Sequence, residues 1–448
     1  MMRRMWGAPA RSCKDPSSFG GRWRAVSPDL GRLWQEYGGT ALTQVVVLVA
    51  HLLSVRLGVI QFGAAGYGEF SIAKRTASLI SFPLLLGMGI SLPRFIARVQ
   101  ATPDIGPRVR AYAMASALVA VCILPGATVL LILLSSAWLP MVFGDGEFGY
   151  YAWPIVVMSL GLYAQTLVYA LYRGLLEMTT ANRFLLITSG IVPLVALLVA
   201  RSDPARCTIL TGYGWLCLAG VYIALGFIRL GSNHTVRDWP DWALIRGSAR
   251  ELVVYGLPRV PGEVGWFGFL AVPVVVVGRQ AGMATAGLFS AALSVVQLIS
   301  SLFTFLSVIL LPKVAGLLSL GRVAIARRLV SRTVAAVAVA ASGLALVLIA
   351  AARIWVPYLL DSTTAEAIAI GRVCCAAGIP LSLHIVLRSP VDAASAFPHN
   401  AVNLLISLGI ILAVLFAVPT ANPAISVAVG SGVLAVLSWR AWRHLLVS

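Results

Sequence analysis

A long apolar motif occurs twice in this chain of 448 residues, and the distance between the two copies is constant. Each matched residue of the first copy recurs 219 positions later. The matched residues are Gly63, Gly68, Phe70, Ser71, Ala73, Leu79, Ile80, Ser81, Leu92, Pro93 and Arg94, the last of which is replaced by Lys313. Such a repeat indicates two homologous halves. Because both copies have a helical pattern, we expect two similar bundles about a pseudo-symmetry axis, with space for a substrate between them.

The composition requires a membrane as the solvent of both halves. Hydrophobic residues make up 59% of the chain and charged residues 11%, whereas soluble proteins carry about 25% charged residues. A spanning helix needs about 20 mostly apolar residues. Six stretches in each half satisfy this: 40–62, 66–90, 110–134, 149–172, 183–200, 209–229, 252–277, 285–311, 331–352, 366–387, 400–418 and 424–440. The sequence therefore predicts an all-α polytopic membrane protein with two six-helix lobes around a central cavity.

The basic residues predict the orientation. With the N-terminus inside, the cytoplasmic segments hold 25 Lys and Arg and the outer loops hold four, and such an excess is typical of cytoplasmic loops. Both termini are therefore expected in the cytoplasm. The expected divisions are a basic leader over 1–39, a first lobe over 40–230, an inter-lobe linker over 231–251 and a second lobe over 252–448. This bias and attraction to anionic lipid account for the net charge of +18 without a nucleic-acid partner.

Sequence motifs of enzymes are absent. The chain contains no GxxxxGK[ST], HExxH or GxSxG, so it carries no phosphate-cradling ATPase loop and no recognisable hydrolase centre. Its six cysteines are scattered and form no cluster with histidine that would suggest a metal. We expect neither enzymatic activity nor a cofactor.

Polar side chains form a stripe on the second span. Ser71, Lys74, Arg75 and Ser78 are spaced by three and four residues, which gathers them on one side of a helix. At the repeat offset the eighth span carries a matching stripe, which consists of Ser290, Ser294 and Gln297. An ionisable group inside a bilayer is costly and usually faces a wet interior. We expect the two stripes to face one cavity; alternatively, the serines only hydrogen-bond between helices.

Five further ionisable residues within the predicted spans are candidates for function. Arg259 and Glu263 are one turn apart and form either a fixed ion pair or a switch that gates the cavity. Arg56 and Arg372 lie near outer ends of spans, where they either line the cavity or reach the interface. His51 is either a hydrogen-bonded interior residue or part of a proton switch. Since cations outnumber anions among these groups, the cavity is expected to attract anions.

Two runs of residues resemble the start of a known family. The runs are GAAGYGEFSIA, from Gly63 to Ala73, and GMGISLPRFIA, from Gly87 to Ala97. They resemble polysaccharide-repeat flippases, the Wzx-type branch of the multidrug/oligosaccharidyl-lipid/polysaccharide (MOP) exporter superfamily, and YGLPR from Tyr255 to Arg259 looks like the opening of that family's seventh helix. The resemblance implies a V-shaped pair of lobes that moves an undecaprenyl-pyrophosphate-linked oligosaccharide between the leaflets of a bacterial inner membrane by alternating access.

The resemblance also implies partners and roles. Besides the lipid-linked oligosaccharide and the bilayer, a glycan polymerase and chain-length machinery are expected partners. Lys74, Arg75 and Arg259 are candidates for contacting the pyrophosphate, because this group needs positive charge in a low-dielectric region. Three alternatives stay open. A drug antiporter would need buried carboxylates in the first half, where Glu69 is the one candidate; a lipid II flippase usually has fourteen spans; and a non-transporting partner of a glycan synthase would show no flipping.

The predicted orientation can be tested by labelling. In a protein without its native cysteines, a cysteine at position 140 should react with an impermeant thiol reagent added outside the cell, because that position lies in a predicted outer loop. A cysteine at position 240 should be protected. The opposite labelling pattern would reverse the orientation and the direction of transport.

Overall fold

The structure, a computed structural model, describes residues 30–99, 105–144, 146–232, 240–395, 397–418 and 422–445. Most of the predicted leader lies outside these residues. The described part holds helices and no strand. In the first half these are α2 (Leu30–Leu84), α3 (Met88–Val99), α4 (Ile105–Leu133), α5 (Ser135–Phe143), η2 (Gly146–Tyr151), α6 (Ala152–Gly174), α7 (Met178–Leu185), η3 (Leu186–Ile191), α8 (Val192–Ala200) and α9 (Pro204–Ser232).

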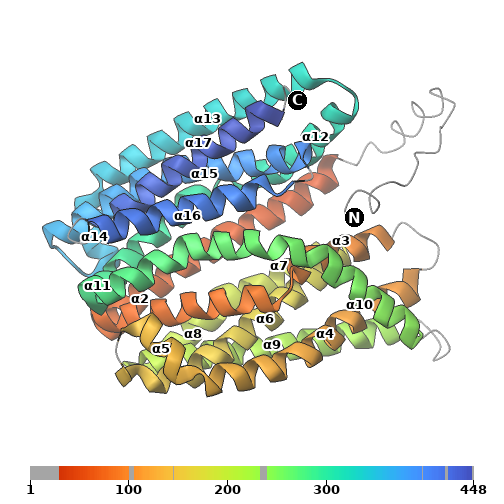
Figure 1. Cartoon of the computed structure of the whole chain (residues 1–448), viewed down its shortest axis with the longest axis horizontal. Coiled ribbons are helices and arrows are strands. Elements are labelled where there is room, and N and C mark those ends of the chain that lie inside the picture. Colours follow the sequence, from red (N-terminus) through yellow and green to blue (C-terminus); the bar gives the residue numbers. More distant parts are fainter. Residues whose placement is uncertain are drawn as a thin grey trace.

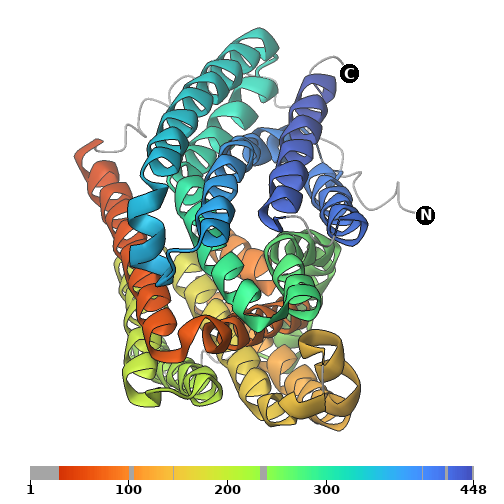
Figure 2. The ribbon, with the colours of Figure 1, turned by 90° about the vertical axis from the view of Figure 1, so that its left-hand side faces the viewer.

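The second half follows the same order of long and short helices. It consists of α10 (Trp242–Gly256), η5 (Leu257–Arg259), α11 (Val260–Ser301), α12 (Thr304–Ser319), α13 (Val323–Ala350), α14 (Ala352–Leu360), α15 (Ala365–Ala394), α16 (His399–Ala417) and α17 (Ala424–Leu445). Figure 1 shows two lobes that lie side by side, with α11 and α2 between them. The end-on view of Figure 2 shows the same division.

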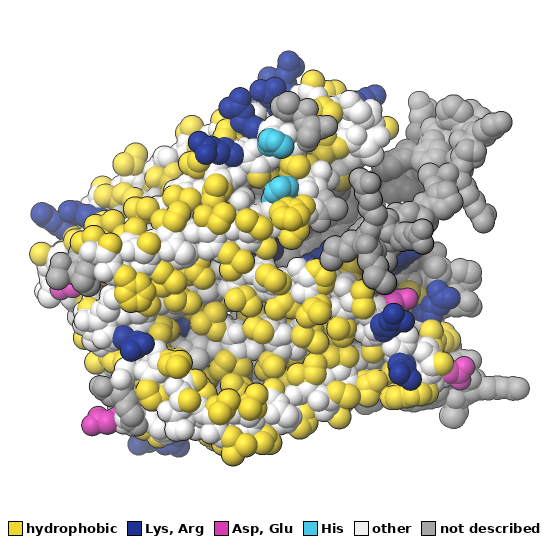
Figure 3. Space-filling view, in the orientation of Figure 1, with side chains coloured by type: hydrophobic (Ala, Val, Ile, Leu, Met, Phe, Trp, Pro, Cys, Tyr) yellow, Lys and Arg dark blue, Asp and Glu magenta, His cyan; other side chains and the backbone are white. Residues whose placement is uncertain are grey.

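The predicted spans agree with the observed helices. Ten helices in the described chain are long and apolar enough to cross a membrane. Two of them, Leu42–Leu84 and Trp242–Ser301, are each long enough to cross twice, and each is broken at a glycine. The all-α polytopic fold is thus confirmed, with twelve crossings. Figure 3 shows hydrophobic side chains over the visible flank and Lys and Arg mainly toward its ends, as expected for a protein surrounded by lipid.

The glycines at the two breaks are equivalent residues of the sequence repeat. Gly63 has φ 68° and ψ 177°, and Gly282 has φ 86° and ψ 165°. Only glycine adopts this region of backbone space readily. The chain can therefore reverse across the membrane without a loop. Both breaks lie at one end of the molecule, which we call the kink end; α2 begins and α17 ends at the opposite end, the terminal end (Figure 1).

A second repeated feature lies at the kink end and was not recognised in the sequence. The Trp138 indole donates a hydrogen bond of 2.8 Å to the Leu131 carbonyl, and the Trp355 indole donates one of 2.8 Å to the Leu348 carbonyl. In both halves the tryptophan lies on a short helix, α5 or α14, that follows a long span. The bond turns each short helix back against the span before it, so the pseudo-symmetry extends beyond the matched motif.

The lobes share a core along α2 and α11. Ile72 and Ala77 of α2 are buried in one cluster with Phe269, Phe289 and Leu293 of α11. By contrast, long apolar side chains on the outer spans are exposed, as Val339 of α13 is at 75%. Apolar surface is favourable there only when lipid covers it.

Replacing the glycines at the breaks should destabilise the fold. We expect Gly63→Ala and Gly282→Ala each to cost about 1–3 kcal/mol, because alanine is strained in this backbone region. Gly126→Ala is the matched control, since Gly126 lies within α4 with no atom near its missing side chain. Thermal unfolding in detergent measures the effect. Equal midpoints for all three variants would contradict the role given to the breaks.

Candidate functional site

The lobes touch through backbone at a crossing of α2 and α11. A side chain on Gly68 would lie 2.0 Å from the Met283 carbonyl oxygen, and one on Gly287 would lie 2.0 Å from the Ala64 carbonyl oxygen. These two contacts are exchanged by the repeat offset, so the pseudo-symmetry axis passes between the two glycines. Small residues permit such an approach of helices in lipid. The crossing lies less than two turns from the breaks and closes the kink end.

Arg75 ties the lobes together in the middle of the molecule. Its Nε and Nη2 donate to the Ser290 hydroxyl at 3.1 and 3.0 Å, and its Nη1 donates to the Leu270 carbonyl at 2.7 Å. All three bonds run from α2 to α11. The structure therefore brings together two predicted site residues, Arg75 and Ser290. Both acceptors are neutral, so the guanidinium charge is not compensated by a carboxylate here.

The remaining members of the two stripes lie close to this tie. Ser71 and Ser294 are buried and flank the Tyr67 hydroxyl from the two lobes. Ser78 donates to the Lys74 carbonyl within its own helix, at 3.1 Å. Gln297 is half-buried one turn beyond Ser294. The two stripes face each other as expected, but at Arg75 and Ser290 their side chains touch directly.

Lys74 and Arg75 are adjacent on α2 and have different hydrogen-bond partners. Adjacent helical residues differ by about 100° in direction; Arg75 reaches the second lobe, while both cations act electrostatically on His51 of the first lobe and Lys74 also acts on Cys207. Lys74 and His51 are both half-buried. No hydrogen-bond or ion-pair partner of Lys74 is found in the described part of the chain. The two cations thus differ in their hydrogen-bond partners, and the expectation that they share one face stays a prediction.

Arg56 makes a second tie between the lobes, at the kink end. Its Nη1 lies 3.4 Å from the Asp361 carboxylate and 3.5 Å from the Pro357 carbonyl, and its guanidinium carbon is 4.8 Å from the centroid of the Tyr358 ring. These three partners belong to α14 or directly follow it. The ion pair is weak because Asp361 is 62% exposed. Arg56 is therefore engaged across the lobe boundary and does not line a cavity as a free cation.

The expected pair between Arg259 and Glu263 is not formed. Arg259 turns back toward the preceding turn, where its Nη1 donates to the Tyr255 carbonyl at 2.5 Å and its guanidinium carbon lies 3.6 Å from the Tyr255 ring centroid. An aromatic ring one turn earlier competes with a carboxylate for a guanidinium. One Glu263 oxygen is buried without a hydrogen-bond partner among the described residues, and the carboxylate points across the lobe boundary toward Gly89.

Arg94 is a residue that sequence reasoning missed. It lies on α3, its guanidinium carbon is 4.4 Å from the Tyr255 ring centroid, and it donates to the Tyr255 hydroxyl. Burial, followed by the positive charges of Arg259 and Arg98, lowers the pKa of Arg94. A sequence signal for Arg94 was present, because the tripeptide LPR occurs both at 92–94 and at 257–259, in the runs that carry the family resemblance.

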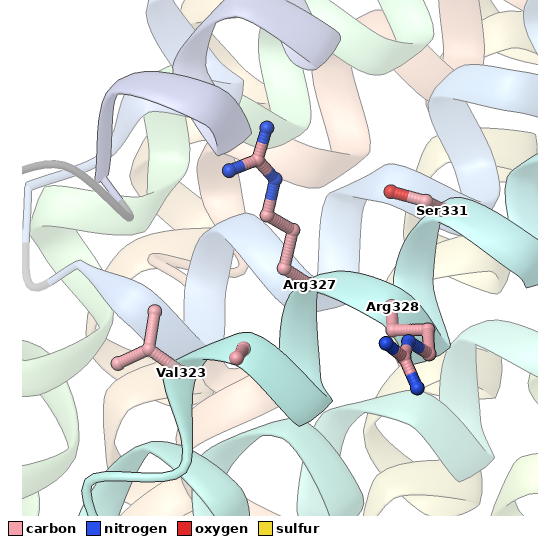
Figure 4. Close-up of a pocket in the computed structure, with 5 residues that line it drawn as sticks. Val323, Arg327, Arg328 and Ser331 are labelled. Atoms are coloured by element: carbon pink, nitrogen blue, oxygen red, sulfur yellow. The ribbon is translucent and has the colours of Figure 1, made fainter.

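Two other places were considered as sites. The Arg372 guanidinium in α15 has a buried Nε without a partner in the described chain, but no second polar group is seen to approach it. A surface cavity of about 540 Å³ lies at the terminal end of α13 and is lined by Arg327, Arg328 and Ser331. Figure 4 shows the two arginines extending from the helix in different directions. This surface cavity is separate from the crossing of α2 and α11.

The crossing at Gly68 should control whether the kink end is closed. Gly68→Ala places a methyl group against the Met283 carbonyl, so we expect the lobes to part there. Spin labels at Glu147 and Thr363, which are exposed on the two lobes at the kink end, should then show a longer distance. Gly220→Ala, where no atom lies near the added methyl, is the control. An unchanged distance in Gly68→Ala would contradict the prediction.

Comparison with solved structures shows which proteins share this fold. No family model and no curated protein matches the sequence. A multidrug resistance MATE family transporter of the MOP superfamily, solved in an inward-facing conformation, is 12% identical, with a TM-score of 0.71 over 91% of this chain and 98% of that one. A multidrug resistance MATE family transporter of the MOP superfamily in an outward-facing conformation is also 12% identical, with a TM-score of 0.64 over 92% of this chain and 95% of that one.

A flippase shares the same architecture. Lipid II flippase MurJ, in an inward closed conformation, is 12% identical, with a TM-score of 0.64 over 91% of this chain and 87% of that one. At such identities the likeness establishes the fold alone. The chain is a multi-pass membrane protein with the two-lobed fold that MATE transporters share with MurJ.

Proposed function

We propose that this protein is a flippase that carries an undecaprenyl-pyrophosphate-linked oligosaccharide, a repeat unit of a surface polysaccharide, from the inner to the outer leaflet by alternating access. The observation that carries the proposal is the pair of cations in the second span, toward the C-terminal end of α2. Lys74 and Arg75 have no carboxylate partner in the described chain, and Arg75 is bonded to a hydroxyl and a carbonyl. An anionic group is the ligand that such uncompensated charge favours.

The bonds of Arg75 are of a kind that a phosphate can replace. A guanidinium binds phosphate through two parallel charge-assisted hydrogen bonds, which are about twice as strong as bonds to neutral acceptors. Arg75 would exchange Ser290 and Leu270 for the diphosphate of the substrate. Because its present bonds hold the lobes together, this exchange would loosen the lobe boundary only when substrate is bound.

The closed kink end fits the first half of such a cycle. On the orientation predicted from Lys and Arg, the terminal end faces the cytoplasm and the kink end faces the outside. On this assignment the outer side is shut by the glycine crossing, by Arg56 with Asp361 and by Arg279, which donates to the Met141 carbonyl at 3.4 Å. The higher TM-score against the inward-facing MATE structure supports the same state.

Two alternatives of the same fold receive less support. For an organic cation a drug antiporter needs carboxylates at the substrate, but Glu69 accepts bonds from Tyr150 and Tyr151 at 3.4 and 3.2 Å, near the kink end. A lipid II flippase shares the diphosphate chemistry, and the twelve crossings rather than fourteen argue against it. Coupling through protonation of Glu263 or His51 remains a hypothesis, and so do a glycan polymerase and chain-length machinery as partners.

Reconstituted transport tests the function. In proteoliposomes with a short-chain lipid-diphosphate oligosaccharide, the parent protein should expose the glycan on the far leaflet, and Lys74→Gln with Arg75→Gln should reduce the rate at least tenfold because the diphosphate loses its counter-charges. Arg353→Gln, which removes an exposed charge at the kink end, is the control. Transport by the double variant at the parent rate would refute the role of the pair, and absence of transport by the parent would favour a non-transporting assembly partner.

A further inference from the structure

The terminal end holds a group of arginines about one aromatic ring. The guanidinium carbons of Arg94 and Arg259 lie 4.4 and 3.6 Å from the centroid of the Tyr255 ring. The two cations are therefore no farther apart than the sum of those distances. Like charges this close repel each other unless an anion lies between or beside them. Arg98, one turn after Arg94, adds to the same positive field.

The carboxylates near this group are already engaged. Glu251 accepts a bond of 2.5 Å from the Tyr112 hydroxyl, and Asp392, which attracts Arg259, accepts one of 2.7 Å from the Asn400 amide. Neither carboxylate forms a hydrogen-bonded ion pair with Arg94 or Arg259 in the described part of the molecule. In the described residues, the guanidiniums of Arg94 and Arg259 thus have donors left for a further acceptor.

The ring itself is held firmly. Phe95 meets Tyr255 edge-on, with 5.5 Å between ring centroids, and stacks on Tyr112. The next residue, Gly256, is in direct backbone contact with Gly87: a side chain on Gly87 would lie 2.4 Å from the Gly256 carbonyl oxygen. Fixed aromatic support holds the guanidiniums in place before a ligand arrives, which reduces the entropic cost of binding.

The two principal arginines belong to different parts of the molecule. Arg94 is on α3 of the first lobe. Arg259 is at the joint where α10, which packs on α3 and α4 of the first lobe, continues into α11 of the second lobe. Along the second lobe Arg259 is 11 residues before Leu270, whose carbonyl accepts a bond from Arg75, which is about 16 Å of helix. The group is thus separate from the mid-span cations.

We propose that Arg94, Arg259 and Arg98, arranged about Tyr255, form a separate binding site for a diphosphate group at the terminal end, where the lipid-linked substrate is first captured. The inference rests on the proposed function for its substrate. The captured diphosphate would neutralise the repulsion between Arg94 and Arg259 and draw the joint of the second lobe toward the first. The same phosphate chemistry is offered by anionic phospholipids, so the test must separate the two sources.

The test measures binding of geranyl diphosphate to the purified full chain in nanodiscs of phosphatidylcholine. We expect Arg94→Gln and Arg259→Gln each to weaken binding at least tenfold, and the double variant to weaken it by less than the product of the two effects, because both arginines hold one ligand. Arg250→Gln removes an exposed charge from α10 and should leave the affinity unchanged. Arg94→Lys, which keeps the charge, should bind better than Arg94→Gln and guards against a folding defect.

Three outcomes would overturn the site. The first is equal affinity for geranyl diphosphate in the parent, Arg94→Gln and Arg259→Gln, and the second is a loss of affinity in Arg250→Gln as large as in those two variants. The third is complete displacement of geranyl diphosphate by phosphatidylglycerol added to the nanodisc, which would assign the site to bulk lipid. Arg75→Met removes only the mid-span cation, so the binding that depends on Arg94 and Arg259 should persist in that variant while transport slows. Arginine-dependent binding together with failure of glycan transport in the parent would confirm the site and refute the proposed function, so the two failures are distinguishable.

Discussion

The contact between the backbones of α2 and α11 is the constraint on which the rest of the molecule depends. Gly68 and Gly287 let two helices approach until the backbone carbonyl of one helix fills the space where the other helix would carry a side chain. Helices in lipid gain little from hydrophobic association, so packing of this closeness must supply the attraction. Because the contact lies on the pseudo-symmetry axis, a small rotation of either lobe about it would open one end of the molecule and close the other.

The arginines of the spans make interactions that are weak enough to be exchanged for others. Arg75 is bonded to a hydroxyl and a carbonyl, Arg56 to a largely exposed carboxylate, and Arg259 to an aromatic ring and a carbonyl. A buried ion pair would compensate these charges more completely, but it would be costly to break. Neutral or exposed partners keep the guanidiniums in place and leave them available to an anion, which suits the proposed binding and release of a diphosphate in each cycle.

The two ends of the molecule are built differently. Equivalent residues of the repeat meet at the kink end, where Gly68 faces Gly287 and the Trp138 bond has its counterpart in Trp355. At the terminal end the contact between Arg94 and Tyr255 is not repeated with the same residues, because the offset relates them to Lys313 and Glu36. There α10 joins the second lobe to the first beside Tyr255. A symmetric end can open and close as two similar surfaces, whereas the asymmetric end can hold a ligand between α3 and the start of α11.

Some features were determined by the sequence alone. The twelve crossings and the two halves were predicted correctly, because the length and polarity of a span are local properties and the bilayer allows few alternatives. The position of the breaks was implicit in the glycines of the repeat, since glycine is the residue that reverses a helix at positive φ. The sequence also predicted that the two polar stripes face each other, but not that Arg75 contacts Ser290, because the repeat offset relates Arg75 to Ser294.

Side-chain partners were decided only by the tertiary structure. Spacing along a helix predicted that Arg259 would pair with Glu263, but the guanidinium reaches back to Tyr255, and Arg94 arrives there from another helix. Lys74 and Arg75 were assigned to one face, but only the packing of the lobes determined that Arg75 is bonded across the boundary to Ser290 and Leu270. Long flexible side chains choose among partners several ångströms apart, and those partners come from segments whose distance depends on how the lobes are packed.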